Sequence, residues 1–368
     1  MMEAILALNA GSSSVKVTCY EADGLAPFLA VQADGIGGET RLKVGGEAAD
    51  IDGSADHATA IRHILTEIVA PRIERCVAVG HRVVHGGARF TAPEIVNDAV
   101  LADIAALTPL APSHQPHNVT GIRSIAAVWP QTPQVACFDT AFHATIPRKR
   151  QVFAIPKAYE AEGVRRYGFH GLSYEGVMKA LPGIVGEAAN GRVIAAHLGN
   201  GASLCAISEG KSRWTSMGFT PLEGLVMGRR PGRLDPGVLI WLMREKGMDA
   251  DAIDGLLNRK CGLYGLSGLS QDMRDLLESD NPAAALAVDV FVDRLVMEIG
   301  AAAAAIGGAD VLVFTGGIGE NAAPIRERVA DALGYLGFSA APGGKPVIVV
   351  PADEEGVIAA AARDLVAA

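Results

Sequence analysis

Two stretches of this chain share one pattern, and this repeat limits the folds that the chain can adopt. Residues 193–207 (VIAAHLGNGASLCAI) resemble residues 4–18 (AILALNAGSSSVKVT). Each has an apolar segment, a tip of Asn, Gly and Ser, and a second apolar segment, as expected of two strands joined by a turn. The similar stretches are short, and chance similarity is the alternative explanation. A true repeat predicts a duplicated architecture in which a similar hairpin opens each half of the chain.

The first tip, NAGSSS, raises the question of a phosphate-binding loop. A P-loop needs G-x-x-x-x-G-K-[ST] between a strand and a helix. Here Gly11 is the one glycine of the tip before Lys16, and the following VKVTCY alternates apolar and polar residues at the strand period of two. We therefore predict a hairpin rather than a P-loop. Backbone N–H groups and hydroxyls at such a tip can bind an anion, and an ordinary serine-rich turn is the alternative.

The second tip, HLGNGAS, has Gly199 and Gly201 on either side of Asn200. This spacing suits a type I′ or G1 turn, in which glycine adopts a positive φ. Glycines at a tip also allow a ligand to approach the backbone closely.

A third glycine-rich segment, TGGIGEN, follows the apolar run DVLVF. The run predicts a buried strand, and the spacing of Ile325, Val329 and Leu333 predicts a helix that begins near Asn321. Strand, glycine turn and helix N-terminus together can hold a nucleotide, because the helix end offers free N–H donors. One such turn is common in α/β proteins, whereas three in one chain favour a nucleotide-binding protein.

The segment before this strand predicts a long helix. Its N-cap and first turn carry Asn281 and Pro282, which are typical of a helix start. The apolar residues of its one face are Val288, Val292, Leu295 and Ile299.

Composition narrows the class of protein. The 368 residues are 49% hydrophobic, which describes a globular chain long enough for two domains. A net charge of −9 disfavours a general nucleic-acid binder. The apolar run IGAAAAAIGGADVLVF contains a charged Asp310 and many weak residues, so we expect no membrane span, and MMEAILALNAG does not resemble a signal peptide. We therefore expect a cytoplasmic protein.

The cysteines indicate neither a disulfide framework nor a zinc site, because they are odd in number and show no C-x-x-C spacing. They are Cys19, Cys76, Cys137, Cys205 and Cys261.

Several segments combine His and Arg with short apolar runs. GHRVVHGGARF contains Arg82 between two histidines, CFDTAFHATIP places Asp139 at the end of a predicted strand, and VRRYGFHGLSYE contains His170 between glycines. A single histidine in such a place is more often structural than catalytic. The density of cationic groups favours a cleft for anions, since arginine binds carboxylate or phosphate through two N–H groups. For the loop GLVMGRRPGRLDPG, a solvated loop is the alternative to an anion clamp.

Seven segments together carry a family resemblance. They are LNAGSSSVK, GHRVVHGG, FDTAFH, RYGFHG, HLGNGAS, TSMGFTPLEGLVMG and FTGGIGEN. All seven resemble acetate kinase motifs and occur in that family's order from residue 8 to residue 321, with a further match at VPADEE.

Acetate kinases share a superfamily with sugar kinases, actin and heat-shock ATPases. The resemblance implies an α/β fold of two duplicated actin-like ATPase domains, with ribonuclease-H-like mixed sheets and helices around a nucleotide cleft. We expect residues 1–141 plus a C-terminal helix at 357–368 to form the N-terminal domain, with the first phosphate hairpin and the acyl site. Residues 142–356 would form the C-terminal domain, with the second hairpin and the adenosine site.

The activity implied is reversible phosphoryl transfer between MgATP and acetate, giving acetyl phosphate and ADP by direct in-line transfer. By resemblance the catalytic residues would be Arg82, Asp139, His170 and Arg230. The metal would be Mg²⁺, with Mn²⁺ as a possible substitute, held by Asn9, Asp139 and Glu354 together with substrate phosphates.

The resemblance also assigns binding residues. Beside the nucleotide phosphates would lie Asn9, Ser12, Ser14, Lys16, His197, Asn200 and Gly201. The adenosine seat would comprise Asp272, Met273, Arg274, Gly317, Ile318 and Asn321. The acyl pocket would comprise Arg82, Val84, Ser113, Phe169 and Pro221.

The chain departs from the family pattern at three positions. Ser113 stands in place of a usual leucine and could admit a longer or hydroxylated acid. Arg233 stands where the family usually has a carboxylate, which predicts a more basic rim. Tyr174 replaces a common histidine, and the sequence offers no interpretation of this change.

Two other functions stay open. A propionate- or butyrate-preferring kinase differs from an acetate kinase only in the acyl pocket. A nucleotide-binding protein without acyl transfer would need few of the residues Arg82, Asp139, His170, Arg230 and Glu354. The expected partners are a short-chain carboxylate and, by family resemblance, a second copy in a homodimer, with neither nucleic acid nor membrane.

Overall fold

A computed structural model describes residues 2–51, 53–339, 341 and 343–367. The chain divides into two compact units. The first comprises Met1–Phe142 and Asp353–Ala368, and the second comprises His143–Ala352. Sequence analysis placed the boundaries at 141/142 and 356/357. The difference at the second boundary assigns Glu354 to the same unit as Arg82 and Asp139.

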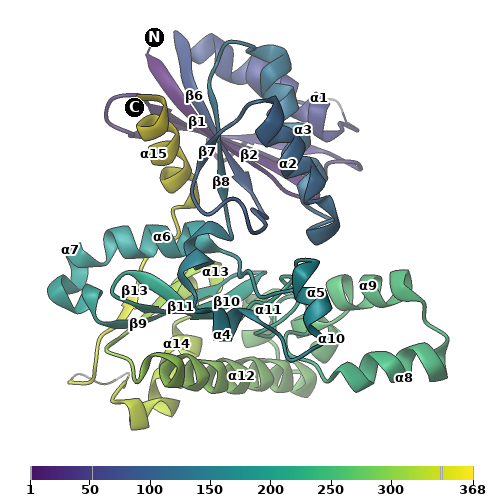
Figure 1. Ribbon diagram of the computed structural model, residues 1–368, viewed down its shortest axis with the longest axis vertical. Helices are drawn as coiled ribbons and strands as arrows, with labels where there is room; N and C mark the ends of the chain where they lie inside the picture. The colour runs from purple at the N-terminus through teal and green to yellow at the C-terminus, as the bar shows by residue number, and fades with distance from the viewer. Residues whose placement is uncertain (1, 52, 340, 342, 368) are drawn as a thin grey trace. The chain divides into compact units, whose positions relative to one another are not determined.

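The first unit contains a mixed sheet with the strand order β5-β4-β3-β2-β1-β6-β8-β7 (Figure 1). β1 runs antiparallel to β2 and parallel to β6, and β6 runs parallel to β8. The strands are β1 Glu3–Ala10, β2 Ser14–Glu21, β3 Pro27–Asp34, β4 Arg41–Val44, β5 Glu47–Ala49, β6 Arg75–Val83, β7 Glu94–Ile95 and β8 Gln134–Phe138.

The second unit contains a sheet with the order β11-β10-β9-β12-β13. β9 runs antiparallel to β10 and parallel to β12, and β12 runs parallel to β13. The strands are β9 Arg192–Leu198, β10 Ala202–Ser208, β11 Lys211–Thr215, β12 Val311–Thr315 and β13 Val347–Val349.

The two sheets share one topology. Strands β3-β2-β1-β6-β8 of the first match β11-β10-β9-β12-β13 of the second in order and direction. The repeated hairpins found in the sequence, β1–β2 and β9–β10, occupy corresponding places. Both predicted hairpins are confirmed, as is the α/β class.

Helices cover both faces of the first sheet, as successive residues of β6 show. A side chain at Gly80 would meet Ile358 of α15, whereas the ring of the next residue, His81, approaches Gly121 of α3. Because neighbouring strand residues point to opposite faces, α15 and α3 lie on opposite sides (Figure 1). The helices of this unit are α1 His57–His63, α2 Asp98–Ala106, α3 Gln115–Val128 and α15 Glu354–Ala367.

The longest helix of the second unit, α12 (Pro282–Ile306), begins as predicted. The Asn281 side chain accepts the N–H of Ala283, Pro282 occupies the first turn, and the predicted apolar face is buried. The other helices are α4 Arg148–Gln151, α5 Lys157–Ala161, α6 Gly171–Ala180, α7 Pro182–Val185, α8 Pro236–Lys246, α9 Ala250–Arg259, α10 Gly262–Ser267, α11 Met273–Leu277, α13 Gly316–Asn321 and α14 Ala323–Ala332. The two units together also contain short 3₁₀ or π-helical turns, which are η1 Ile64–Val69, η2 Ala70–Arg72, η3 Thr108–Leu110, η4 Ala141–Thr145, η5 Gly186–Asn190 and η6 Gly334–Leu336.

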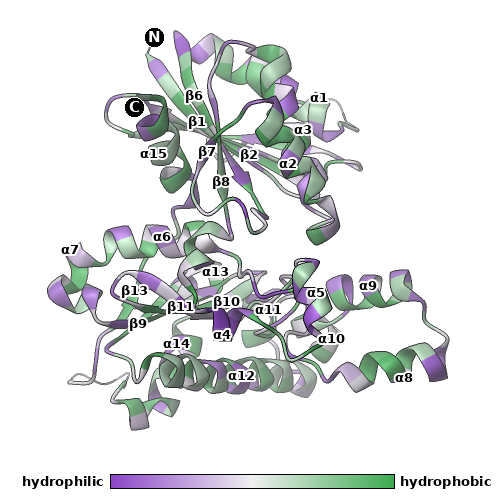
Figure 2. Cartoon of the chain, in the orientation of Figure 1, coloured by the Kyte–Doolittle hydropathy of each residue, from purple (hydrophilic) through white to green (hydrophobic). Residues whose placement is uncertain are grey.

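Helix α8 differs from the other long helices in its exposure. None of its residues is buried, although much of it is hydrophobic (Figure 2). In the described part of the chain, no helix is both long and apolar enough to cross a bilayer.

One local prediction was wrong. Neither Gly199 nor Gly201 has a positive φ, so the tip between β9 and β10 is not a type I′ or G1 turn. The helix predicted to begin near Asn321 is confirmed as α14, which starts at Ala323 and buries Ile325 and Val329. A short helix that the sequence did not predict, α13, precedes it at Gly316. Glycine suits this position, because its φ is +76° and a side chain there would meet the backbone of Leu198.

Candidate active site

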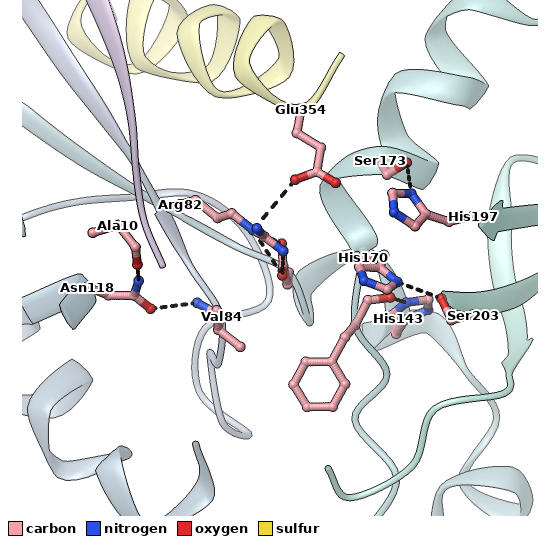
Figure 3. Close-up of polar contacts among 12 residues, drawn as sticks. Ala10, Arg82, Val84, Asn118, His143, His170, Ser173, His197, Ser203 and Glu354 are labelled. Atoms are coloured by element: carbon pink, nitrogen blue, oxygen red, sulfur yellow. Dashed lines mark hydrogen bonds and ion pairs between the residues drawn. The ribbon is translucent and has the colours of Figure 1, made fainter. Parts of the chain in front are cut away.

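Two buried side chains, His57 and Asn118, hold the β1–β2 hairpin in place. His57 Nε2 donates to the carbonyl oxygen of Gly11 at 2.8 Å. Asn118 donates to the carbonyl of Ala10 at 2.9 Å and accepts the N–H of Val84 at 3.0 Å (Figure 3). Asn118 therefore joins the end of β1 to the end of β6, which places the hairpin tip relative to the residues that follow Arg82.

The predicted phosphate residues of the first hairpin face outward. Asn9 and Ser14 are half-buried, while the side chains of Ser12 and Lys16 are exposed. The Gly11 N–H donates to Ser14 O at 2.8 Å, which closes the tip into a tight turn. The hydroxyls and Lys16 are thus available to an anion.

Arg82, Asp139 and Glu354 form a charged cluster in the first unit. Arg82 is on β6, Asp139 directly follows β8, and Glu354 opens α15. Arg82 Nη2 lies 2.7 Å from Asp139 Oδ2, and its Nε lies 3.6 Å from Glu354 Oε2 (Figure 3). Although burial alone would lower the pKa of Arg82, the two carboxylates outweigh burial and raise it.

The charge of this cluster suits a divalent cation. Two carboxylates face one guanidinium, which leaves one negative charge in a largely buried place. Within the described ranges no group of three or more His, Cys, Asp or Glu side chains is arranged to hold a metal. Mg²⁺ commonly uses one or two carboxylates and takes its other ligands from water and phosphate, so Asp139 and Glu354 fit Mg²⁺ as a partial shell.

In the second unit, His170 lies in a strained backbone position. It precedes α6 with φ +59° and ψ +24°, in the left-handed region, which costs a residue with a side chain about 1–2 kcal/mol. The preceding carbonyl, of Phe169, is bound by the buried His143 through Nε2 at 3.0 Å (Figure 3). Since Nε2 must donate to this carbonyl, His143 is held as the tautomer with its proton on Nε2, and burial lowers its pKa to about 4.

The His170 ring packs on the second hairpin. It stacks on His197 of β9 with ring centroids 4.2 Å apart, and its Nδ1 lies 2.9 Å from Ser203 Oγ of β10. The Nδ1 of His197 is in turn bound to Ser173 Oγ at 2.8 Å. Both rings are therefore fixed by hydroxyl groups at Nδ1.

Gly201 marks a point at which His170 and Arg230 converge. A Cβ placed on Gly201 would lie 2.7 Å from Arg230 Nη2 and 3.3 Å from His170 Nε2. Arg230 donates through Nη1 to the neutral carbonyl of Pro221 at 2.7 Å, and burial lowers its pKa to about 10. A largely desolvated guanidinium bound only to a carbonyl carries a charge that an anion would neutralise, and only a residue without a side chain lets the Arg230 and His170 side chains come this close to the backbone of the hairpin tip.

A cavity of about 460 Å³ in the second unit gathers all six of the predicted adenosine residues. It is lined by Asp272, Met273, Arg274, Gly317, Ile318 and Asn321, and by Asn200 of the hairpin tip. Asp272 also caps α11 and binds Arg274, with Nη2 and Oδ2 2.6 Å apart. Sequence reasoning missed the other lining residues, Gly199, Gln271, Leu277, Ala322 and Pro324.

The predicted acyl residues belong to both units. Val84 is buried in the first unit, where Ser113 lies in an exposed turn before α3. Phe169 is buried and Pro221 half-buried in the second unit.

Arg233 does not simply add positive charge to the rim, as the sequence suggested. Its Nη1 lies 3.2 Å from the Oε1 of Glu298, whose side chain is 2% exposed. Burial raises the pKa of Glu298, and Arg233 opposes this effect. The two residues form a pair that spans 65 positions of sequence, which no local pattern reveals.

Known proteins resemble this chain over nearly its whole length. The model of the acetokinase family matches residues 4–363. An acetate kinase of Nitrobacter hamburgensis is 47% identical, over 97% of this chain and 95% of the relative. An acetate kinase of Methylocella silvestris is 45% identical, over 98% and 97%.

Solved structures agree. A propionate kinase of Francisella tularensis superposes with a TM-score of 0.92 at 34% identity, covering 99% of this chain and 100% of the other. An acetate kinase of Porphyromonas gingivalis gives 0.91 at 38% identity, covering 99% of each. The predicted actin-like ATPase fold is confirmed by these likenesses. The chain belongs to the acetokinase family.

Proposed function

We propose that this chain is an acetate kinase, which transfers the γ-phosphoryl group of MgATP reversibly and directly to acetate. Family membership supports the reaction class. The observation that carries the proposal at the level of the site is the approach of Arg230 Nη2 and His170 Nε2 to one point beside Gly201. Two hydrogen-bond donors that lie so close together suit the oxygens of one phosphoryl group.

Phosphoryl transfer asks a protein mainly for alignment and charge neutralisation. Arg230 and His170 would bind equatorial oxygens of the transferring group, where negative charge is concentrated. Arg82 would hold the acceptor carboxylate, and Asp139 would keep the Arg82 guanidinium in one orientation through three hydrogen bonds. The cavity lined by Asp272, Ile318 and Asn321 would hold the adenosine.

The family uses ATP or ADP with a divalent metal ion. We propose Mg²⁺ as that ion, with Mn²⁺ as a substitute, and Asp139, Glu354 and Asn9 as the residues that hold it. When bound, the ion would neutralise phosphate charge. The excess of carboxylates over guanidinium groups in the cluster supports this assignment.

A preference for propionate or butyrate is the second candidate. It is favoured by Ser113, a small polar residue where the resemblance expects leucine. One methylene in an apolar pocket changes discrimination by only about 1–3 kcal/mol, so acetate remains the first choice. Ser113→Leu should lower the propionate-to-acetate ratio of kcat/KM if Ser113 lines the acyl pocket.

A hydroxamate assay tests the proposal by trapping acyl phosphate formed from MgATP with acetate, propionate, butyrate or glycolate. We expect acetate to give the highest kcat/KM, and His170→Ala and Arg230→Ala each to lower kcat by about 100-fold or more. A longer acid preferred over acetate would establish the second candidate. Nucleotide binding without acyl phosphate from any acid would instead indicate a non-catalytic nucleotide-binding protein.

We also propose a homodimer in the cytoplasm, where ATP is available. The exposed apolar residues of α8 support a protein partner, since several large apolar side chains exposed on one helix are typical of an interface. They are Val238, Ile240, Trp241 and Met243, each 39–50% exposed.

A further inference from the structure

A buried hydrogen-bond chain reaches His170 from the side opposite Nε2. The hydroxyl of Tyr174 on α6 lies 2.5 Å from Ser203 Oγ, and this same oxygen lies 2.9 Å from His170 Nδ1. Tyr174 and Ser203 are both fully buried. The chain thus links the position at which this sequence departs from its family to the imidazole at the candidate site.

The order of donors in this chain follows from chemistry. A phenol is a stronger acid than an aliphatic alcohol, so the Tyr174 hydroxyl is the preferred donor to Ser203. The serine hydroxyl has one proton, which is then free to be donated to His170 Nδ1. A neutral imidazole that accepts at Nδ1 carries its proton on Nε2.

Nε2 is the nitrogen that the proposed function uses, because it lies beside Arg230 Nη2 around Gly201. With its proton on Nε2, His170 can donate to an oxygen in that space. With its proton on Nδ1, His170 would present a lone pair to the same oxygen and repel it. The tautomer therefore decides whether the neutral imidazole of His170 can stabilise an anion.

Further contacts fix the position of Tyr174 next to His170. The Tyr174 N–H donates to His170 O as the first bond of α6, and the side chains of both residues reach the same oxygen, Ser203 Oγ. The Tyr174 ring also meets the ring of His143 edge-on at 5.7 Å, and His143 holds the carbonyl before His170.

We propose that Tyr174 is a positioning residue, which acts through Ser203 to hold His170 as the tautomer with its proton on Nε2. A histidine at position 174, common in the family, could titrate near neutral pH, whereas the phenol does not. The consequence for catalysis rests on the proposed function, while the tautomer itself does not.

The test compares the wild-type protein with Tyr174→Phe, which keeps the ring and removes the hydroxyl. Nitrogen-15 NMR, with the His170 signals assigned from His170→Gln, reports the tautomer directly. We expect the Nε2–H tautomer in the wild type and a larger Nδ1–H fraction in Tyr174→Phe. We also expect kcat to fall about 10-fold, with the KM for MgATP changed less than about twofold.

Three further variants separate this role from general packing. Ser203→Ala breaks the same link, so Tyr174→Phe added to Ser203→Ala should cost nothing more. Tyr174→His supplies an N–H donor and should recover part of the lost kcat. Tyr167→Phe removes another buried phenol hydrogen bond, to Gly163 O at 2.8 Å, and should leave the His170 tautomer and kcat unchanged.

The proposal is overturned if His170 carries its proton on Nδ1 in the wild type. It is equally overturned if Tyr174→Phe, folded by circular dichroism, leaves the tautomer unchanged, whatever happens to kcat. If the wild type forms no acyl phosphate from any acid, the proposed function fails, and the NMR result still decides the role of Tyr174.

Discussion

Arg82 and Asp139 form a two-point ion pair in which the carboxylate is 1% exposed. Nη2 and Nε of the guanidinium lie 2.7 and 3.2 Å from Asp139 Oδ2, and Nε lies 3.1 Å from Oδ1. The pair is 57 residues apart in sequence and forms because β6 and β8 are parallel neighbours whose carboxyl ends meet at one edge. Both proposed roles of the site, anion binding and metal binding, depend on this contact.

Asp139→Asn keeps the shape of the side chain and removes its charge. We expect kcat to fall by about 100-fold or more, because Arg82 loses its principal orienting partner and the metal loses a carboxylate. Unfolding free energy should fall by about 1–3 kcal/mol, since one partner of a largely buried pair is neutralised. The hydroxamate assay and urea unfolding measure the two effects, and an active Asp139→Asn enzyme would contradict the proposed role.

Glu354→Gln tests the metal more selectively. Because Glu354 is 3.6 Å from Arg82, its removal disturbs the ion pair less than Asp139→Asn. We expect the Mg²⁺ concentration at half-maximal velocity to rise by about 10-fold, with kcat partly recovered at high Mg²⁺. Glu355→Gln, which removes the neighbouring charge in the first turn of α15, is the matched control. Equal effects of the two variants would indicate a general electrostatic effect and not a ligand.

Gly201→Ala places a methyl group between the two candidate anion-binding donors. Its Cβ would lie 2.7 Å from Arg230 Nη2 and 3.3 Å from His170 Nε2, closer than ordinary van der Waals contact. We expect kcat to fall by about 10-fold or more while the protein stays folded, because the methyl group would displace the Arg230 and His170 side chains from their present positions. Steady-state kinetics measure the loss.

The control for this variant is Gly255→Ala. Gly255 lies within α9, and a Cβ there meets no atom within 4 Å. Alanine should leave kcat unchanged and stabilise the helix by up to about 1 kcal/mol. A Gly201→Ala enzyme as active as the Gly255→Ala enzyme would show that the approach of Arg230 and His170 beside Gly201 is not used.

The strands and hairpins could be predicted from sequence because they depend on local alternation and apolar runs. The glycines of the second tip were misread for a physical reason. Gly201 is needed for the absence of a side chain beside Arg230, and not for a positive φ. A single sequence shows that a glycine is present, but it does not show whether the position needs a positive φ or needs the absence of a side chain.

The supporting contacts of the site could not be predicted from spacing. Asn118 contacts Ala10, and Tyr174 contacts Ser203, across 108 and 29 positions. Which atoms meet depends on how α3 and α6 pack on their sheets. The family motifs contain Ala10 and Ser203, whereas Asn118 lies outside the motifs and Tyr174 is a position where this chain departs from the family.

The buried histidines predict a loss of stability in acid. His81 is bonded through Nε2 to Gln134 at 2.8 Å, and burial lowers its pKa from 6.5 to about 4. Between these two values the unfolded chain binds a proton that the folded chain does not. The free energy of unfolding therefore falls as the pH falls from about 6.5 to 4, by up to about 1.4 kcal/mol per pH unit for this residue.

Urea unfolding of the wild type and His81→Gln between pH 4.5 and 8 tests this linkage. Below pH 6.5 the unfolding free energy of His81→Gln should change less steeply with pH than that of the wild type, by the equivalent of about one bound proton. This difference in slope does not depend on the stability of the variant at pH 8. His143, whose pKa burial also lowers to about 4, keeps part of the pH dependence in the variant. Parallel curves for the two proteins would show that His81 is not the linked group.

Trp241→Arg tests the partner surface on α8. Trp241 is 50% exposed between other exposed apolar residues on a helix with no buried residue, and the resemblance implies a homodimer. A charge in such a surface must be desolvated when two copies meet, so we expect a dimer in the wild type and a monomer in the variant by analytical ultracentrifugation. Ile184→Arg is the control, because Ile184 on α7 is 51% exposed outside the α8 surface and should leave the dimer intact. A dimer that survives both substitutions would place the interface elsewhere. Dissociation by both would show that the effect of Trp241→Arg is not specific to α8.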